Sequence, residues 1–289
     1  MDSRVAGIPR LAAAGAIVII ASGVAGCASG GSPGKSTASA SAQTPVQAIQ
    51  LAASTSRDVN TFTANMSIQG SSSKSAGTFS LAGTVSEQIH PSVRAEADYS
   101  TFSAAGQSFP GGMSEIVTTN SLYLKLSMLN QALHTNKPWL EIPFSALSKA
   151  SGVNISALFS QIQTSSPLDQ SQLFAGAENV RMVGTGVVDG VPVTEYTGSL
   201  AMSQALTKLP ADLRASIGQA LEKAGISTVR FTEWVDAQHH VRKTTVKETG
   251  SAITETTTTT ITSINQPVNI QVPAASQTTQ LPGSILSSM

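Results

Sequence analysis

The chain has few of the residues on which metal, cofactor and nucleic-acid sites are usually built. Cys27 is its single cysteine, so no disulfide can form within the chain. Its four histidines form no His-Glu-x-x-His motif and have no cysteine pair beside them. Charged residues make up only 12% of the chain, 17 basic against 17 acidic, and no basic stripe is present. We therefore expect no metal, no cofactor and no nucleic-acid partner.

Catalytic motifs are scarce as well. Ser71-Ser72-Ser73-Lys74 has the serine-to-lysine spacing of penicillin-recognising enzymes, but it lies in a Gly- and Ser-rich segment between two expected strands. No second motif supports it, and no Gly-x-Ser-x-Gly elbow joins a strand to a helix. Asp236 is expected to form a turn, with its carboxylate accepting hydrogen bonds from backbone amides. We assign no catalytic residue and do not expect an enzyme.

The amino terminus has an apolar run that is too short to cross a bilayer comfortably. Leu11 to Ala21 is uncharged and follows two basic residues, Arg4 and Arg10. Spanning a membrane takes roughly 20 apolar residues, whereas a short apolar core behind basic residues is typical of a secretory signal peptide. We expect residues 1–26 to be a signal peptide.

Cys27 ends a segment, Val24-Ala25-Gly26-Cys27, that resembles the bacterial lipobox. The peptidase that cuts there needs small side chains before the cut, and the cysteine thiol takes the diacylglycerol. The alternative is an ordinary signal peptide with a chance cysteine. We expect a lipid on Cys27 that holds the protein at the extracytoplasmic face of the cell membrane, because two or three acyl chains anchor stably. Residues 28–44 lack aromatic, acidic and large aliphatic residues, so 27–44 should be a flexible linker.

Residues 45–289 should form a single α+β domain. Thr44, Pro45 and Gln47 predict a helix start with a capping box, and further helices are expected at 154–162, from Ser166, and from Pro210 to Gly225. Period-two alternation and turn residues predict about ten strands. They are expected at 62–68, 77–90, 93–99, 115–126 (a hairpin), 139–142, 180–188, 191–200, 228–236, 241–249 and 253–264. The expected architecture is one large, curled antiparallel sheet with four or five helices.

Such a sheet, covered incompletely by short helices, could enclose an apolar cavity or an ordinary packed core, and the residue pattern alone leaves both open. If a cavity exists, we expect its lining to come from the inward positions of the first two strands and from one tryptophan. These candidate residues are Phe62, Ala64, Met66, Ile68, Phe79, Leu81, Val85 and Trp234.

Three stretches resemble the LppX/LprAFG family of actinobacterial lipoproteins. They are Val188-Asp189-Gly190-Val191-Pro192-Val193-Thr194-Glu195-Tyr196-Thr197-Gly198, then Glu233-Trp234-Val235-Asp236 with Val241-Arg242-Lys243, and Asn265-Gln266-Pro267-Val268-Asn269-Ile270-Gln271-Val272-Pro273. The resemblance implies a LolA-like half-barrel whose cavity accepts the acyl chains of lipids or glycolipids, in a protein that carries or presents them. The alternative is a non-catalytic module that has a filled core and docks an envelope protein.

Overall fold

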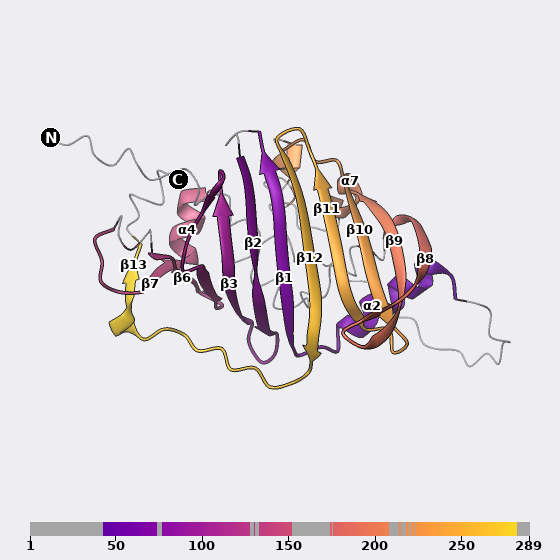
Figure 1. Ribbon diagram of the computed structural model, residues 1–289, viewed down its shortest axis with the longest axis horizontal. Coiled ribbons are helices and arrows are strands. Elements are labelled where there is room, and N and C mark those ends of the chain that lie inside the picture. Colours follow the sequence, from indigo (N-terminus) through magenta and orange to yellow (C-terminus); the bar gives the residue numbers. More distant parts are fainter. Residues whose placement is uncertain are drawn as a thin grey trace.

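The structure is a computed structural model, and its arrangement of strands and helices is drawn in Figure 1. It describes residues 43–73, 77–127, 133–151, 176–207 and 224–281, together with residues 130, 174, 214, 218–219 and 221–222. The predicted signal peptide, Cys27 and most of the predicted linker lie outside the described residues. So do the helix predicted at 154–162, the helix start at Ser166 and the beginning of the helix predicted from Pro210.

The first described element is helix α2 (Pro45–Ser56), which begins where the sequence predicts. The Thr44 hydroxyl accepts a hydrogen bond from the Gln47 amide at 3.3 Å, and the Gln47 side chain accepts one from the Thr44 amide at 3.0 Å. The predicted capping box is thereby confirmed. It satisfies two of the amides that a helix start leaves without a helical partner.

All strands of the described residues belong to one open sheet of 13 strands in the order β13-β7-β6-β5-β3-β2-β1-β12-β11-β10-β9-β8 (Figure 1), with β4 beside β3. One half is built by β1 (Thr61–Ser72), β2 (Gly77–Gln88), β3 (Arg94–Ala104), β4 (Gln107–Ser108), β5 (Met113–Val117), β6 (Ser121–Lys125) and β7 (Trp139–Pro143). The other half is built by β8 (Glu178–Val188), β9 (Val191–Ala201), β10 (Thr228–Asp236), β11 (Val241–Thr249) and β12 (Ile253–Ile264). Within each half, strands that follow one another in sequence lie side by side and run antiparallel, except that β5 pairs with β3 and not with β4.

The two halves meet where the first and the last long strands pair, β1 with β12. This pairing joins residues about 200 positions apart, such as Phe62 and Ile264. The turn between β8 and β9 consists of Asp189 and Gly190, with φ angles of 47° and 80°. These are the positive angles that a two-residue hairpin turn requires, as the Asp-Gly pair predicts.

The predicted α+β fold with a large antiparallel sheet is confirmed, and the structure adds short elements that the sequence analysis did not predict. They are β4, β13 (Thr278–Gln280), the helices α4 (Phe144–Ser151) and α7 (Met202–Thr207), and a 3₁₀ turn η3 (Ala275–Gln277). After β12 the chain runs in an extended course to the opposite end of the sheet (Figure 1), where β13 pairs in parallel with β7. These elements have too few residues to show a period of their own.

Alternation along the strands separates an inner face, on which α2 packs, from an outer face. Ile49 of α2 lies in one cluster with Phe231, which is 1% exposed. The neighbours of Phe231 in β10, Arg230 and Thr232, point to the outer face. Hydroxyl groups are common there, and the hydroxyl oxygens of Thr245 in β11 and Thr258 in β12 lie 3.2 Å apart. The apolar residues of the domain are therefore concentrated on the inner face.

Candidate functional site

The inner face of β1 and β2 carries seven of the eight residues predicted to line a cavity. Residues opposite one another in an antiparallel pair share a face, and the register pairs Ala64 with Val85 and Ile68 with Leu81. Five of the seven belong to one apolar cluster, formed by Ile68, Leu81, Val85, Ala97, Tyr99, Met113 and Leu126, with Met66, Phe79 and Phe102 packed against it. The other two belong to a neighbouring cluster, formed by Val59, Phe62, Ala64, Ile89 and Ile261, with Ile264 packed against it.

Three large side chains at this cluster are only half-buried. Met66, Phe79 and Phe102 pack against buried residues but remain partly accessible. Tyr99, which belongs to the same cluster, is by contrast 3% exposed. The apolar surface of β1–β3 is therefore not fully covered, and the contact of these residues with a lipid stays a prediction.

Trp234 lies apart from the other seven predicted residues. In β10 it alternates with Glu233 and Val235, which are buried, so its side chain lies on the outer face. There the Lys243 ammonium group is 4.6 Å from the centre of the Trp234 ring. Cation–π contact of this kind is an ordinary surface interaction. The period-two pattern of β10 places Trp234 and Phe231 on different faces of the strand. The alternation in the sequence therefore already indicates that Trp234 does not share the inner face.

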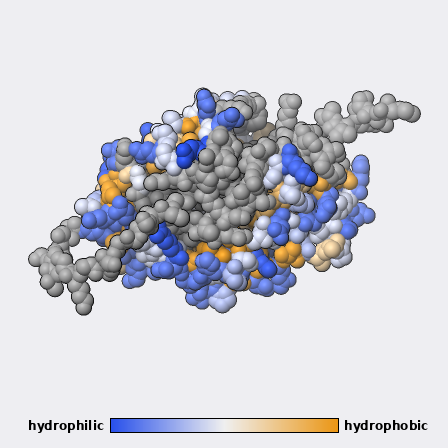
Figure 2. All heavy atoms as spheres, turned by 180° about the vertical axis from the view of Figure 1, so that it is seen from behind, coloured by the Kyte–Doolittle hydropathy of each residue, from blue (hydrophilic) through white to orange (hydrophobic). Residues whose placement is uncertain are grey.

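A third apolar cluster covers the inner face of β9 and β10, at the other end of the sheet. Phe231 stacks on Phe174 with ring centres 4.0 Å apart. The cluster is formed by Ile49, Phe174, Ala177, Leu200, Ala205 and Phe231, with Val180, Tyr196, Met202 and Val246 packed against it. Figure 2, seen from behind, shows hydrophobic residues in separate patches among hydrophilic ones.

Between the apolar clusters, part of the inner face of β11 and β12 is polar. Met66 and Ile68 lie opposite Thr259 and Thr257, and Thr259 in turn lies opposite Thr244. All three threonines are half-buried. The inner face therefore offers apolar surface at its two ends and hydroxyl groups in the middle.

Two carboxylic acids lie buried on the inner face of the first half of the sheet. Glu87 of β2 and Glu115 of β5 are 8% and 4% exposed. Burial raises the pKa of each carboxyl group to about 8, because an apolar environment disfavours the charged form. The nearby Glu115 carboxyl group also contributes to a raised pKa of Tyr99, whose main cause is burial. Both acids are therefore largely protonated at neutral pH.

A further pair of acids, Glu248 and Glu255, lies opposite one another across β11 and β12 on the same face. Burial raises the pKa of both groups, and the neighbouring Glu255 raises that of Glu248 further. Like charges in direct cross-strand positions repel one another, so protonation of at least one of the two carboxyl groups is favoured. None of these four acids is predicted from the sequence to have a role, although Glu87 continues the inward series of Leu81 and Val85 at period two.

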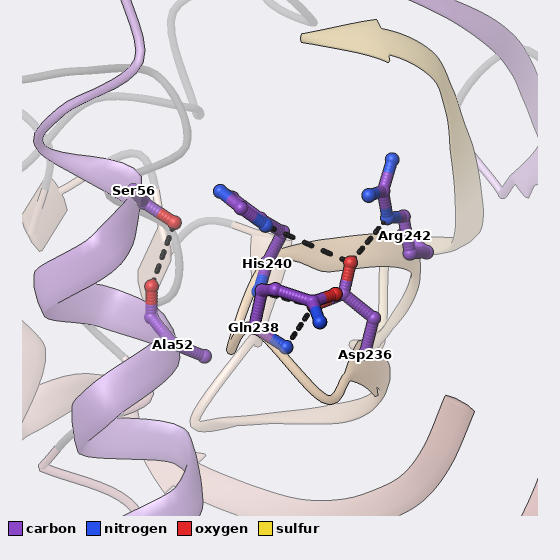
Figure 3. A network of polar contacts seen from close by, with 6 residues as sticks. All are labelled: Ala52, Ser56, Asp236, Gln238, His240 and Arg242. Carbon is purple, nitrogen blue, oxygen red and sulfur yellow. Dashed lines mark hydrogen bonds and ion pairs between the residues drawn. The ribbon is translucent and has the colours of Figure 1, made fainter. Parts of the chain in front are cut away.

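The buried carboxylate of Asp236 has the structural role that the sequence predicts. It accepts hydrogen bonds from the amides of Gln238 and His240, both at 2.9 Å, and from Arg242 Nε at 2.7 Å (Figure 3). His240 Nδ1 lies 3.6 Å from Asp236 Oδ2. Burial alone would raise the pKa of Asp236, but these hydrogen bonds and the Arg242 charge more than offset it, so the pKa is lowered. The network fixes the turn between β10 and β11.

Within the described ranges, no group of three or more His, Cys, Asp and Glu side chains is placed to hold a metal ion. Over the same part of the chain, no helix combines the length and the apolar character needed to span a membrane.

Comparison with known proteins bears on the fold. No protein-family model matches the chain. It is 29% identical over 121 residues to an uncharacterized 31.2 kDa protein of Streptomyces griseus, encoded in the rplA–rplJ intergenic region, and the match spans 40% of the length of each chain.

Solved structures give longer matches at low identity. LprF from Mycobacterium bovis aligns with 80% of this chain and 97% of its own, at 11% identity and a TM-score of 0.51. The lipoprotein LppX from Mycobacterium tuberculosis aligns with 78% of this chain and 98% of its own, at 18% identity and a TM-score of 0.45. The chain therefore has the LolA-like fold of LprF, which confirms at the level of the fold the resemblance to LppX/LprAFG lipoproteins that the sequence indicates.

Proposed function

We propose that this protein is a non-catalytic envelope lipoprotein that binds lipids or glycolipids by their acyl chains on the inner face of its sheet, and carries or presents them. Residues 1–26 act as a signal peptide, Cys27 carries the lipid anchor, and 27–44 form a flexible linker to a single domain of residues 45–289.

The observation that carries this proposal is the partly covered apolar surface of β1–β3. Met66, Phe79 and Phe102 are large and apolar, and they remain half-buried on the face that α2 and the buried clusters also occupy. Removing apolar surface from water gains roughly 25 cal/mol per Å², so an acyl chain laid on these residues would be held without charged contacts. The fold shared with LprF supports the same reading.

The basic residues of the second half of the sheet argue against a site that recognises a charged head group. Arg242 is engaged by Asp236. Arg230 is exposed and alternates with the inward Val229 and Phe231. Arg181 lies opposite Thr197, which shares the outer face with Thr232. Arg181 and Arg230 therefore lie on the outer face, and the Arg242 guanidinium is paired with the Asp236 carboxylate.

Co-purification provides the test. Residues 28–289, expressed in an actinobacterial host and purified without detergent, are expected to carry lipid that mass spectrometry identifies. Met66→Trp would fill the inner face and should reduce the bound lipid several-fold. Asn65→Trp is the matched control, because Asn65 is the exposed neighbour of Met66 on the outer face of the same strand, and it should leave the bound lipid unchanged.

A filled core predicts a different outcome. Overpacking a filled core costs about 1–3 kcal/mol, so Met66→Trp would then lower the melting temperature while neither protein carried lipid. That result would favour the alternative of an interaction module without a lipid site.

A further inference from the structure

The large apolar side chains that are exposed in the described part of the chain are concentrated at one end of the sheet. Six such residues occur, namely Val46, Leu51, Met182, Val183, Val187 and Val272. Two lie on α2 and three on β8. The three on β8 are the most exposed of all, with Met182, Val183 and Val187 at 53%, 55% and 68%. We call these three residues the apolar rim.

The apolar rim leads onto the inner face. Met182 lies opposite Tyr196, and Val187 opposite Pro192, two positions on the same face of β9. Tyr196 packs against the cluster of Phe231, and so does Val180, two residues before Met182 in β8. Apolar surface therefore continues from the free edge of the sheet to the cluster on its inner face.

The edge is a poor template for another strand. Among the strands that the structure describes, β8 is the last of the sheet and pairs only with β9. Its register shifts between Glu178 and Arg181 and again between Met182 and Gly184. Irregularities of this kind interrupt the row of backbone groups that an added strand would need, and they are a common protection of sheet edges. A second copy of the chain or an extended peptide fits this edge less well than a fluid apolar surface.

The proposed linker and its lipid anchor place the membrane near the apolar rim. α2 follows the proposed linker directly and lies beside β8 at the same end of the sheet (Figure 1). A flexible chain of the length of residues 28–44 has a typical end-to-end distance of about 20–25 Å. The anchor on Cys27, which is part of the proposed function, therefore keeps this end of the domain close to the membrane.

We propose that the apolar rim contacts the membrane surface, so that the β8 end of the sheet is where an acyl chain passes between the bilayer and the inner face. The contact deepens the proposed function and rests on it. Exposed apolar groups that reach the boundary between head groups and acyl chains gain stability from the area that they bury there. Val180 and Tyr196 lie next on the path from the rim to the inner face.

A fluorescent probe at the rim tests this contact. The acylated protein has no free thiol once Cys27 is modified, which mass spectrometry verifies, so Val187→Cys supplies one labelling site for an environment-sensitive dye. The labelled protein is reconstituted into vesicles of equal parts phosphatidylcholine and phosphatidylglycerol, with and without nitroxide-labelled lipid. Thr84→Cys, at an exposed position on the outer face of β2, and Gln280→Cys, at an exposed position in β13 at the other end of the sheet, are the matched controls.

The dye at position 187 should shift to shorter wavelengths and be quenched by the nitroxide lipid several-fold more than the dye at position 84 or 280. Equal quenching at all three positions would overturn the proposal. So would shielding of position 187 without quenching, accompanied by a dimeric mass, because a second copy would then cover the edge.

Transfer kinetics separate this inference from the proposed function. Met182→Asp combined with Val187→Asp should slow uptake of a fluorescent lipid from vesicles several-fold, while binding of the same lipid added from detergent solution stays unchanged. If both measurements stay unchanged, the rim proposal fails and lipid binding stands. If no lipid binds to the unaltered protein in either measurement, the proposed function fails.

Discussion

Glu115→Gln gives a sharp test of how the interior of this domain is built. Glu115 is 4% exposed among apolar residues, and its carboxyl group titrates at about 8 in the folded protein against 4.5 in the unfolded chain. Between these two values the folded state keeps a proton that the unfolded state has released. Folding stability must then fall as the pH rises, by about 1.4 kcal/mol per pH unit for this group, and the fall ends above pH 8.

The magnitude follows from this slope. Raising the pH from 5 to 7 should cost the unaltered protein about 2.5 kcal/mol through Glu115 alone. Gln has nearly the same shape and cannot ionise, so Glu115→Gln removes this loss. Any constant cost of burying the amide cancels, because only the change with pH is compared. The melting temperature of the variant minus that of the unaltered protein should therefore be about 5–10 °C larger at pH 7 than at pH 5.

Urea unfolding followed by tryptophan fluorescence at several pH values between 5 and 8 measures this change. Glu222→Gln is the control, because Glu222 is exposed, and its stability difference from the unaltered protein should stay constant over this range. Asp236 does not interfere, because its pKa is lowered and its contribution to stability is therefore complete above about pH 5. A stability difference for Glu115→Gln that is the same at pH 5 and pH 7 would refute the reasoning, since it would mean that Glu115 is ionised and solvated in the folded protein.

Three other outcomes are expected. Cys27→Ala should move the protein from the membrane to the soluble fraction or the medium in a cell fractionation, and persistence at the membrane would reveal a second anchor. Gly83→Ala should lower the free energy of unfolding by about 1–3 kcal/mol or more, because a Cβ there would meet the backbone of Asp98 and Tyr99, whereas Thr84→Val on the exposed side should change it little. Affinity for a fluorescent fatty-acyl probe should rise with chain length and stay nearly constant between low and high salt, whereas a steep fall with salt would indicate a site driven by the head group.

Local chemistry was sufficient to predict most of the sheet. The strands Thr228–Asp236, Val241–Thr249 and Ile253–Ile264 have the predicted bounds, because alternation and turn residues act over a few positions. Gly225 also ends its helix as expected, with a φ of 70°. The backbone amides of Gly225 and Ile226 donate hydrogen bonds to the carbonyl oxygens of Glu222 and Leu221. These features depend on neighbours in the sequence.

Features that depend on distant contacts were not predicted. The sequence does not show that β12 pairs with β1, or that β13 reaches β7 at the far end of the sheet. Gly83 illustrates the consequence. The sequence allows a large side chain at this position, yet the register shift of β3 brings the backbone of Asp98 and Tyr99 against it. An enlarging substitution at Gly83 would therefore disturb the fold and would not test lipid binding on the inner face. Met66 is the better position for that test.

In both halves of the sheet, an aromatic ring on the inner face lies across a glycine of the neighbouring strand. Gly70 lies directly opposite Phe79, and Gly198 directly opposite Phe231. In each pair the ring lies across the glycine, so that a Cβ on Gly198 would come within 2.6 Å of the Phe231 ring. An aromatic side chain that lies flat over a neighbouring strand covers that strand's backbone and stabilises the pair. Because it extends along the sheet and not away from it, it supplies apolar surface while leaving the space above the sheet to other groups. Above Phe231 this space is filled by Phe174 and Ile49, whereas Phe79 stays half-buried, so only the pair of Gly70 and Phe79 leaves accessible apolar surface.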